Sequence, residues 1–189
     1  SKGQILVRIK YTGVCKSQLM EASGLRGIDK WLPHGFGHEA SGIIIDSNNS
    51  KKFKKNDKII CSWIRRKNHH SKGFFLYDEN NKKVNFGDVA TFGNFAILSE
   101  SCVYNKPKGL DFKTAALFGC AIPTGMGMVF NQLNLKKKNK ILLIGLGGVG
   151  LSSLFALKIK NLQEQVYILE KNKEKKNIAK KEGFKNFIN

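Results

Sequence analysis

The segment from Gly145 to Gly150 could bind phosphate, because it reads G-L-G-G-V-G and matches the G-x-G-x-x-G spacing. In such a turn Gly145 permits a tight bend, Gly147 lets the backbone approach a pyrophosphate, and Gly150 allows close packing of helix on strand. Gly148 and Val149 would open a helix whose free N–H groups and partial positive charge attract phosphate. We therefore predict a dinucleotide site here. The alternative is a glycine-rich turn that binds nothing.

An acidic residue stands where a dinucleotide site needs one. Glu170 follows Gly150 by 20 residues and ends the next apolar run. A carboxylate at this position accepts hydrogen bonds from the hydroxyls of the adenosine ribose. Its charge would also repel a 2′-phosphate, so NAD is predicted in preference to NADP. Lys171 and Lys173 lie close by and keep NADP open as the alternative.

Two cysteines and a histidine could bind a metal ion. Cys15 lies in T-G-V-C-K-S, His38 in G-H-E-A-S-G, and Cys120 follows Gly119 much later in the chain. Thiolates and imidazoles are the usual ligands of zinc. Their spacing, however, is not that of a local zinc motif, and a single cysteine is more often a small core residue. On spacing alone, both metal binding and packing remain open.

The elements that would position these residues change along the chain. Alternating apolar and polar residues predict a strand at 4–12, with Tyr11 on the apolar face, and short apolar runs predict more strands. Those runs lie at 43–45, 58–61 and 95–98. The polar stretch 65–88 predicts a long irregular loop.

From residue 111 the pattern becomes helical, and Pro123 suits the start of a second helix. Strands and helices then alternate, as in a parallel sheet whose strands are buried on both faces. The predicted elements are strands at 140–144 and 165–169, helices at 148–160 and 172–182, and the start of a third strand at 186–189. Gly183 is a suitable helix stop.

These segments together resemble the zinc-containing medium-chain alcohol dehydrogenase family over essentially the whole chain. The shared motifs occur in the family's order: G-V-C-x-S, G-H-E-A-S-G, D-K-I at 57–59, T-F at 91–92, G-C…T-G and the glycine loop. The resemblance implies an α/β fold with a β-rich part. A GroES-like β-barrel catalytic domain, incomplete, would span 1–125, and the N-terminal part of a Rossmann NAD-binding domain would span 126–189.

The resemblance also implies roles for particular residues. It makes Cys15, His38 and Cys120 the ligands of one catalytic zinc ion, with a fourth position left open for water or substrate. The remaining implied site residues are Glu39 as a neighbour or transient ligand of the metal, Ser17 as a proton relay, and Thr124 beside the nicotinamide ring.

The chain departs from the family's pattern in several places. Met20 replaces a histidine that extends the proton relay in some members, which leaves His34 as a candidate substitute, and Gln18 stands where an aspartate is common. The stretch 65–94 has no cysteine, and His69 and His70 cannot replace four thiolates. We therefore expect no structural zinc, and we expect Cys61 and Cys102 to pack in the barrel or remain free thiols.

The implied function is hydride transfer between an alcohol, or the corresponding aldehyde or ketone, and a nicotinamide cofactor. One alternative is a zinc-free relative of the quinone-reductase type. Another is a non-catalytic basic module that binds nucleic acid, since the formal net charge is +19. The lysines are spread through nearly every polar segment and no nucleic-acid-binding motif accompanies them, so no specific nucleic acid is expected.

Composition sets the remaining expectations. A chain of 189 residues with 41% hydrophobic residues is not generally disordered. No apolar run is long enough for a transmembrane helix, and the first residues do not form a signal peptide. Four cysteines without C-x-x-C spacing favour a reducing, cytoplasmic compartment. From the resemblance we expect the chain to be cut at both ends and the parent protein to form a homo-oligomer.

Overall fold

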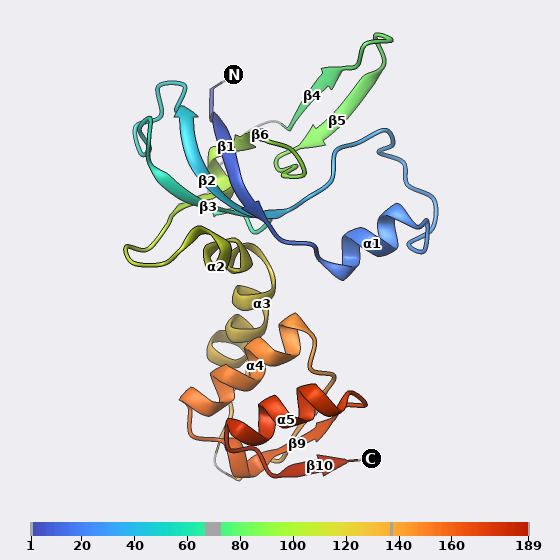
Figure 1. The fold of residues 1–189 in the computed structure, drawn as a ribbon, viewed down its shortest axis with the longest axis vertical. Coiled ribbons are helices and arrows are strands. Elements are labelled where there is room, and N and C mark those ends of the chain that lie inside the picture. The colour runs from blue at the N-terminus through green and yellow to red at the C-terminus, as the bar shows by residue number, and fades with distance from the viewer. Residues whose placement is uncertain (1, 67–72, 137, 189) are drawn as a thin grey trace. The chain divides into compact units, whose positions relative to one another are not determined.

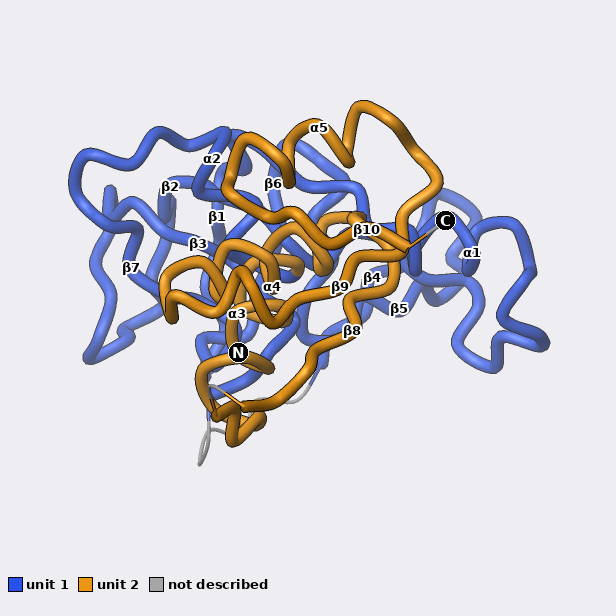
Figure 2. The backbone as a smooth tube through the Cα atoms, turned by 90° about the horizontal axis from the view of Figure 1, so that it is seen from below, with its two compact units in different colours: residues 1–120 blue, residues 121–189 orange. Residues whose placement is uncertain are grey.

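The computed structural model describes residues 2–66, 73–136 and 138–188 (Figure 1). The chain divides into two compact units, residues 1–120 and 121–189, which we call unit 1 and unit 2 (Figure 2). Our expected domain boundary, near residue 125, lies within the first helix of unit 2.

Unit 1 contains a five-stranded antiparallel sheet in the order β6-β1-β2-β3-β7. Its strands are β1 (Gln4–Thr12), β2 (Glu39–Asp46), β3 (Lys58–Ser62), β6 (Phe95–Ser99) and β7 (Val103–Asn105). The predicted strands at 4–12, 43–45, 58–61 and 95–98 are thereby confirmed. The core of the unit forms where alternate side chains, such as Val7 and Ile44, point to the same face.

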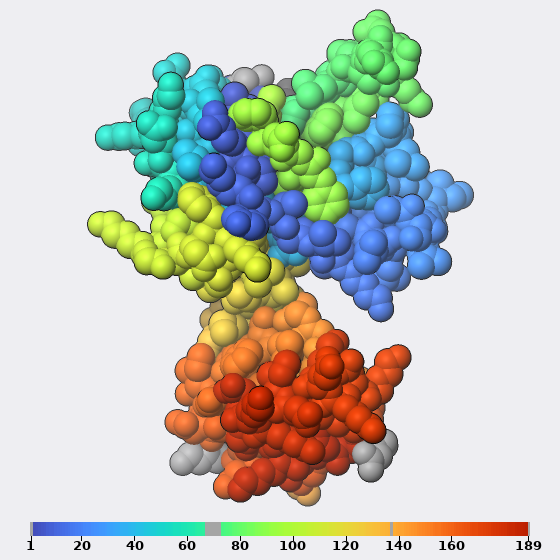
Figure 3. All heavy atoms as spheres, in the orientation of Figure 1, coloured from blue at the N-terminus to red at the C-terminus, as the bar shows by residue number. Residues whose placement is uncertain are grey.

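Two predictions about unit 1 were wrong. Tyr11 is 50% exposed, because β1 shifts register against β2 between Ile9 and Tyr11 and the strict alternation ends there. The stretch 65–88 is not irregular throughout: β4 (Phe74–Tyr77) and β5 (Lys83–Gly87) pair as an antiparallel hairpin. The run Phe74-Phe75-Leu76-Tyr77 carried the strand signal, and Figure 3 shows the hairpin standing out from unit 1 in green.

Unit 1 also contains four short helices: α1 (Lys16–Ala22) and η1 (Glu100–Cys102) lie between strands, and α2 (Phe112–Ala116) and η2 (Leu117–Gly119) follow the last strand. The predicted helix beginning near residue 111 is confirmed, because the Oδ1 of Asp111 accepts a hydrogen bond from the N–H of Thr114 at 2.9 Å and caps α2. Helix α1 was not predicted. It buries no residue, so it has no apolar stripe to reveal it.

Unit 2 has the alternating order expected of a dinucleotide-binding domain, with a three-stranded parallel sheet in the order β10-β9-β8. Its elements are α3 (Ala121–Gly127), a π-helical turn η3 (Met128–Gln132), β8 (Ile141–Ile144), α4 (Gly148–Ile159), η4 (Gln163–Gln165), β9 (Val166–Leu169), α5 (Lys173–Lys181) and β10 (Asn186–Ile188). The predicted strands and helices of this half are confirmed, including the stop at Gly183, whose φ is 90°.

Strand β8 is not buried on both faces as predicted. Ile141 and Leu143 pack against the core of unit 2, whereas Leu142 and Ile144 are 56% and 68% exposed. The reason is that the buried core of unit 2 packs against only one face of this strand.

Among the described residues, no single helix is both long and apolar enough to cross a membrane. One bent pair, 112–119 and 121–132, passes that test jointly by length and composition alone.

Candidate metal centre and dinucleotide loop

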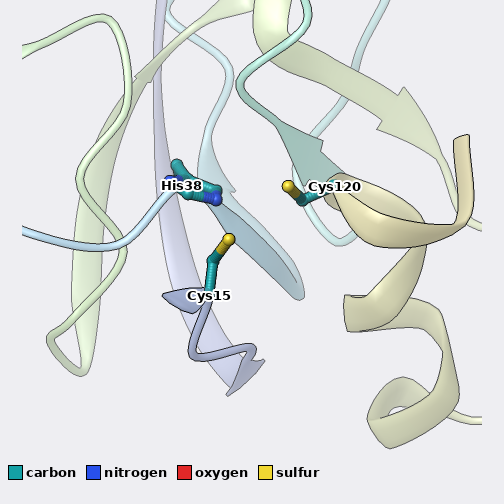
Figure 4. Close-up of side chains that lie close together, drawn as sticks. All are labelled: Cys15, His38 and Cys120. Atoms are coloured by element: carbon teal, nitrogen blue, oxygen red, sulfur yellow. The ribbon is translucent and has the colours of Figure 1, made fainter. Parts of the chain in front are cut away.

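Three potential metal ligands that are far apart in the sequence come together in unit 1. The Sγ atoms of Cys15 and Cys120 and a ring nitrogen of His38 all lie within 4.8 Å of one another (Figure 4). Cys15 is the N-cap residue of α1, His38 directly precedes β2, and Cys120 follows η2. We call these three residues the Cys/His centre.

The backbone at His38 is held by its neighbour Gly37. The φ angle of Gly37 is +94°, a conformation that favours glycine, and a Cβ atom here would lie 2.4 Å from the Oγ1 of Thr91. The N–H of Gly37 donates to the Oε1 of Gln18 on α1. Gln18 therefore connects the helix that follows Cys15 to the loop that carries His38.

Cys120 is positioned by close packing of η2 on the sheet. The hydroxyl of Ser62, at the end of β3, donates to the carbonyl oxygen of Gly119 at 2.6 Å. A Cβ on Gly119 would lie 2.3 Å from the carbonyl oxygen of Cys61 and 2.6 Å from the Cβ of Glu39. No side chain larger than hydrogen fits there, so the residue before Cys120 must be glycine.

The electrostatics of the Cys/His centre favour a bound cation. The pKa of the Cys120 thiol is raised to about 12, first by burial and then by nearby Cys15 and Glu39, while a hydrogen bond with Trp63 opposes this shift. Without a compensating positive charge, two thiolates and a carboxylate would repel one another.

His38 is suited to metal binding as a neutral base. Burial lowers its pKa, and the carboxylate of Glu21 opposes that shift. Its buried Nε2 has no hydrogen-bond partner among the residues that the structure describes. A buried ring nitrogen of this kind is costly unless a ligand satisfies it. The Cys₂His donor set therefore fits a zinc ion with an open fourth position.

Two further predicted site residues lie beside the Cys/His centre. The hydroxyl of Ser17 donates to the Sγ of Cys15 at 3.2 Å. Glu39 is only 4% exposed, and its side chain fills the space next to Gly13 and Gly119. The structure thus brings Ser17 and Glu39 into the same region as the three potential ligands.

Trp63 was missed by the sequence reasoning. Its side chain forms a hydrogen bond with Cys120 and lowers the pKa of that thiol, although the residue is 52% exposed. A signal was present in the sequence, because Trp63 directly follows β3, the strand that also carries Cys61 and Ser62. The indole N–H of tryptophan is a hydrogen-bond donor.

The glycine loop of unit 2 has the geometry that its spacing predicts. Gly145 has a φ of +80° and makes the turn after β8. A Cβ on Gly150 would lie 2.0 Å from the carbonyl oxygen of Gly145, so α4 can approach the loop only with glycine there. A Cβ on Gly147 would meet nothing within 4 Å, which leaves space for a ligand beside the backbone.

Glu170 is tied to the glycine loop. Its Oε2 accepts the N–H of Leu146 at 2.5 Å and its Oε1 accepts the N–H of Asn172 at 2.8 Å. These two backbone hydrogen bonds hold the pKa of Glu170 below its usual value, and the hydrogen bond from Asn172 has the larger effect. The carboxylate is therefore ionised at neutral pH and lies against the loop.

The other predicted cofactor residues belong to unit 2 as well. Gly148 and Val149 open α4. Thr124 is half-buried in α3 directly before Gly125, where a Cβ would lie 2.3 Å from the carbonyl oxygen of Val149. Lys171 is exposed after β9.

The four cysteines are free thiols. Cys61 and Cys102 are fully buried, as expected, and burial raises the pKa of both thiols, so they are poor nucleophiles. Neither belongs to a group of potential metal ligands among the described residues. His69 and His70, which bear on the expected absence of a structural zinc, lie outside the described residues.

Comparisons with known proteins show what the chain is similar to. Residues 1–108 match the family described as the alcohol dehydrogenase GroES-like domain. S-(hydroxymethyl)glutathione dehydrogenase of Paracoccus denitrificans is 24% identical over 99% of the chain and 56% of its own length. An NAD-dependent alcohol dehydrogenase of Sulfolobus acidocaldarius is 29% identical over 80% of the chain and 46% of its own length.

Solved structures show the same fold. Benzyl alcohol dehydrogenase of Acinetobacter calcoaceticus superposes with a TM-score of 0.83 at 23% identity, covering all of this chain and 57% of that one. A quinone oxidoreductase of Pseudomonas syringae gives a TM-score of 0.71 at 20% identity, covering 98% of this chain and 50% of that one.

The chain spans about 56% of the length of curated relatives such as the Paracoccus enzyme. The expected fold, a GroES-like part followed by part of a Rossmann domain, is confirmed by the family match and by the structural similarity. The chain belongs to the alcohol dehydrogenase GroES-like domain family, among the medium-chain alcohol dehydrogenases.

Proposed function

We propose that the whole protein is a zinc-dependent oxidoreductase that transfers hydride between an alcohol and a nicotinamide cofactor. The observation that carries this proposal is the convergence of Cys15, His38 and Cys120 within 4.8 Å, from three separate segments. Two thiolates and a neutral imidazole balance the charge of Zn²⁺ and leave its fourth position open. When bound there, zinc acts as a Lewis acid that lowers the pKa of an alcohol.

The chain's own residues would then handle the proton. Ser17 already hydrogen-bonds to Cys15, so its hydroxyl lies at the edge of the Cys/His centre. A hydroxyl in that position can accept a proton from an alcohol while passing its own proton outward. Met20 cannot carry the proton further, so in this proposal the relay leads from Ser17 to solvent.

Unit 2 would hold the cofactor. Gly147 leaves room for a pyrophosphate beside the N-terminus of α4, and Glu170 supplies an ionised carboxylate next to the loop. That carboxylate favours the hydroxyls of NAD over the 2′-phosphate of NADP. The named NAD dependence of the Sulfolobus relative supports the same choice. The substrate would be a small alcohol or its aldehyde or ketone.

Zinc content tests the proposal directly. Chelator-washed protein should contain about one tightly bound zinc that depends on Cys120, and the whole protein should oxidise alcohols with NAD. C120S should abolish both that zinc and turnover, because a hydroxyl is a poor zinc ligand. The buried, non-ligand change C102S is the matched control and should retain both. Wild-type protein that binds no zinc would instead favour a reductase of the metal-free quinone-reductase type.

A further inference from the structure

A second cluster of potential ligands lies in unit 1 and shares no residue with the Cys/His centre. The Nε2 of His34 lies 2.7 Å from the Oδ2 of Asp29 and 3.7 Å from the Oε1 of Glu21. The three side chains are between 11% and 24% exposed, so they are largely removed from water. We call Glu21, Asp29 and His34 the His34 cluster. Its three ligand atoms all lie within 4.8 Å of one another.

Second contacts orient two of these side chains toward the centre of the cluster. The Nδ1 of His34 lies 3.0 Å from the carbonyl oxygen of Gly35, so Nδ1 carries the hydrogen and Nε2 faces inward. The Oδ1 of Asp29 accepts the N–H of Trp31 at 2.8 Å, which leaves Oδ2 for His34. Outer contacts of this kind are how metal ligands are usually held in place.

Glu21 is oriented in the same way. Its Oε2 accepts a hydrogen bond from the Nε2 of Gln18 at 3.3 Å and lies 4.0 Å from the guanidinium of Arg26. The other oxygen, Oε1, is the one that faces His34. The backbone beside His34 is fixed as well, because the N–H of Gly35 donates to the carbonyl oxygen of Asn85 in β5 at 2.8 Å.

We propose that the His34 cluster is a binding site for a divalent transition-metal ion. One imidazole nitrogen and two carboxylates suit Mn²⁺, Co²⁺ or Zn²⁺, whereas Mg²⁺ and Ca²⁺ prefer oxygen ligands alone. Ligands bound at about 2.0–2.2 Å lie about 3.0–3.6 Å from one another. The separations of 2.7 and 3.7 Å in the cluster bracket that range, so only small side-chain movements are needed.

The surroundings of the His34 cluster allow an ion to enter and to retain water molecules as further ligands. Glu21 and His34 line a cavity of about 220 Å³, which has space for water ligands beside three protein ligands. The segment 16–34 lies at the surface of unit 1, in blue in Figure 3. An ion bound here would join α1 to the irregular segment 23–34 and, through the backbone of Gly35, to β5.

The negative charge of the two carboxylates in the cluster favours a bound cation. The chain has 33 basic and only 14 acidic residues, yet two of those acids converge on one imidazole. With Nδ1–H turned to Gly35, the lone pair of Nε2 would face carboxylate oxygens unless a cation lies between them. A proton is the competitor: burial lowers the pKa of His34, but its hydrogen bonds to Gly35 and Asp29 outweigh this and raise it.

Cobalt titration of the metal-free chain, from which the zinc of the Cys/His centre has also been removed, separates this site from the Cys/His centre. Thiolate ligands give Co²⁺ a strong near-ultraviolet charge-transfer band, which oxygen and nitrogen ligands do not. Wild-type protein should bind a cobalt with that band and a second cobalt without it. H34Q and the isosteric D29N should each lose the second cobalt and keep the band, which also shows that unit 1 is folded. C120S should lose the band and keep the second cobalt.

Manganese provides an independent measurement, because Mn²⁺ binds thiolates weakly. Electron paramagnetic resonance measures the Mn²⁺ that stays free during a titration, and from it the wild type should bind one ion per chain. The affinity for that ion should be at least about tenfold weaker in D29N and H34Q than in the wild type. The surface change E79Q is the matched control and should bind like wild type. The proposal is overturned if wild type binds no metal beyond the thiolate-linked ion, or if D29N and H34Q bind as much as E79Q. The cluster would then be a proton-bridged ion pair.

Discussion

The hydroxyl of Ser17 donates a hydrogen bond to the sulfur of Cys15 at 3.2 Å, across one turn at the start of α1. Cys15 is itself the N-cap residue of that helix and a proposed zinc ligand. The same hydroxyl can therefore stabilise a thiolate and stand next to a bound alcohol. These two roles make different predictions for zinc binding and for turnover.

Replacing Ser17 with alanine should slow alcohol oxidation by the whole protein about 100-fold, because the relay loses its first hydroxyl. Zinc should stay bound, since all three ligands remain. S17T keeps a hydroxyl and should recover most of the rate. Steady-state kinetics together with elemental analysis check this. Equal rates for S17A and wild type would remove Ser17 from the relay, and loss of zinc would make it a support of Cys15.

Zinc affinity of the Cys/His centre should rise with pH. The pKa of Cys120 is raised to about 12, by burial first and then by Cys15 and Glu39, so at neutral pH zinc must displace the proton of this thiol. That proton alone makes the affinity about tenfold stronger for each unit of pH between 6 and 8. The lowered pKa of His38 means that the imidazole adds little competition above neutral pH.

Competition with a chromophoric chelator at pH 6, 7 and 8 measures this dependence. The C102S variant is the matched control, because it keeps all three ligands and its zinc affinity should depend on pH as the wild type's does. A zinc affinity that is independent of pH in wild type would show that Cys120 is not a thiolate ligand.

Two glycines of the phosphate loop should respond differently to alanine. G150A should destabilise unit 2 by about 2 kcal/mol or more, because the new Cβ would lie 2.0 Å from the carbonyl oxygen of Gly145. G147A should fold normally, since its Cβ meets nothing within 4 Å, but it should weaken dinucleotide binding at least about tenfold. Thermal unfolding and NAD titration distinguish the two effects. Normal NAD binding by G147A would contradict the assigned pyrophosphate position.

Replacing Glu170 with glutamine should weaken NAD binding more than NADP binding. The carboxylate that repels a 2′-phosphate is lost, and so is one acceptor for the N–H groups of Leu146 and Asn172. Comparative titration with both cofactors measures the ratio, with the exposed change E164Q as control. An equal loss for both cofactors would show that Glu170 supports the loop without reading the ribose.

The stability of unit 2 should also depend on pH through the ionisation of Glu170. Its pKa is lowered in the folded chain by hydrogen bonds from Asn172 and Leu146. A lowered carboxylate pKa adds stability above the unfolded value, and this stability is lost as pH falls through the folded value. Unfolding of wild type should therefore become easier on acidification below the usual glutamate pKa of 4.5, and E170Q should lose less stability over that range. The same pH dependence in both proteins would contradict this linkage.

Much of the architecture followed from the sequence, because it depends on local patterns. Apolar alternation predicted β1, and the order of strand, glycine loop, helix and strand predicted β8, α4 and β9. The side chain of Asp111 and the freedom of Gly183 marked helix ends. These features need only neighbouring residues, so they can be read without knowing what packs against them.

Other features were decided by tertiary structure. Spacing alone left Cys15, His38 and Cys120 open to two interpretations, because the distance between them depends on how β1, β2 and η2 pack. Helix α1 has no buried face, so nothing in its pattern reveals it, and the hairpin β4–β5 was hidden by its polar surroundings. The His34 cluster likewise exists only because α1, the segment after it and β5 come together. Periodicity reports which face of an element is apolar, whereas sites are built from contacts between elements that are distant in sequence.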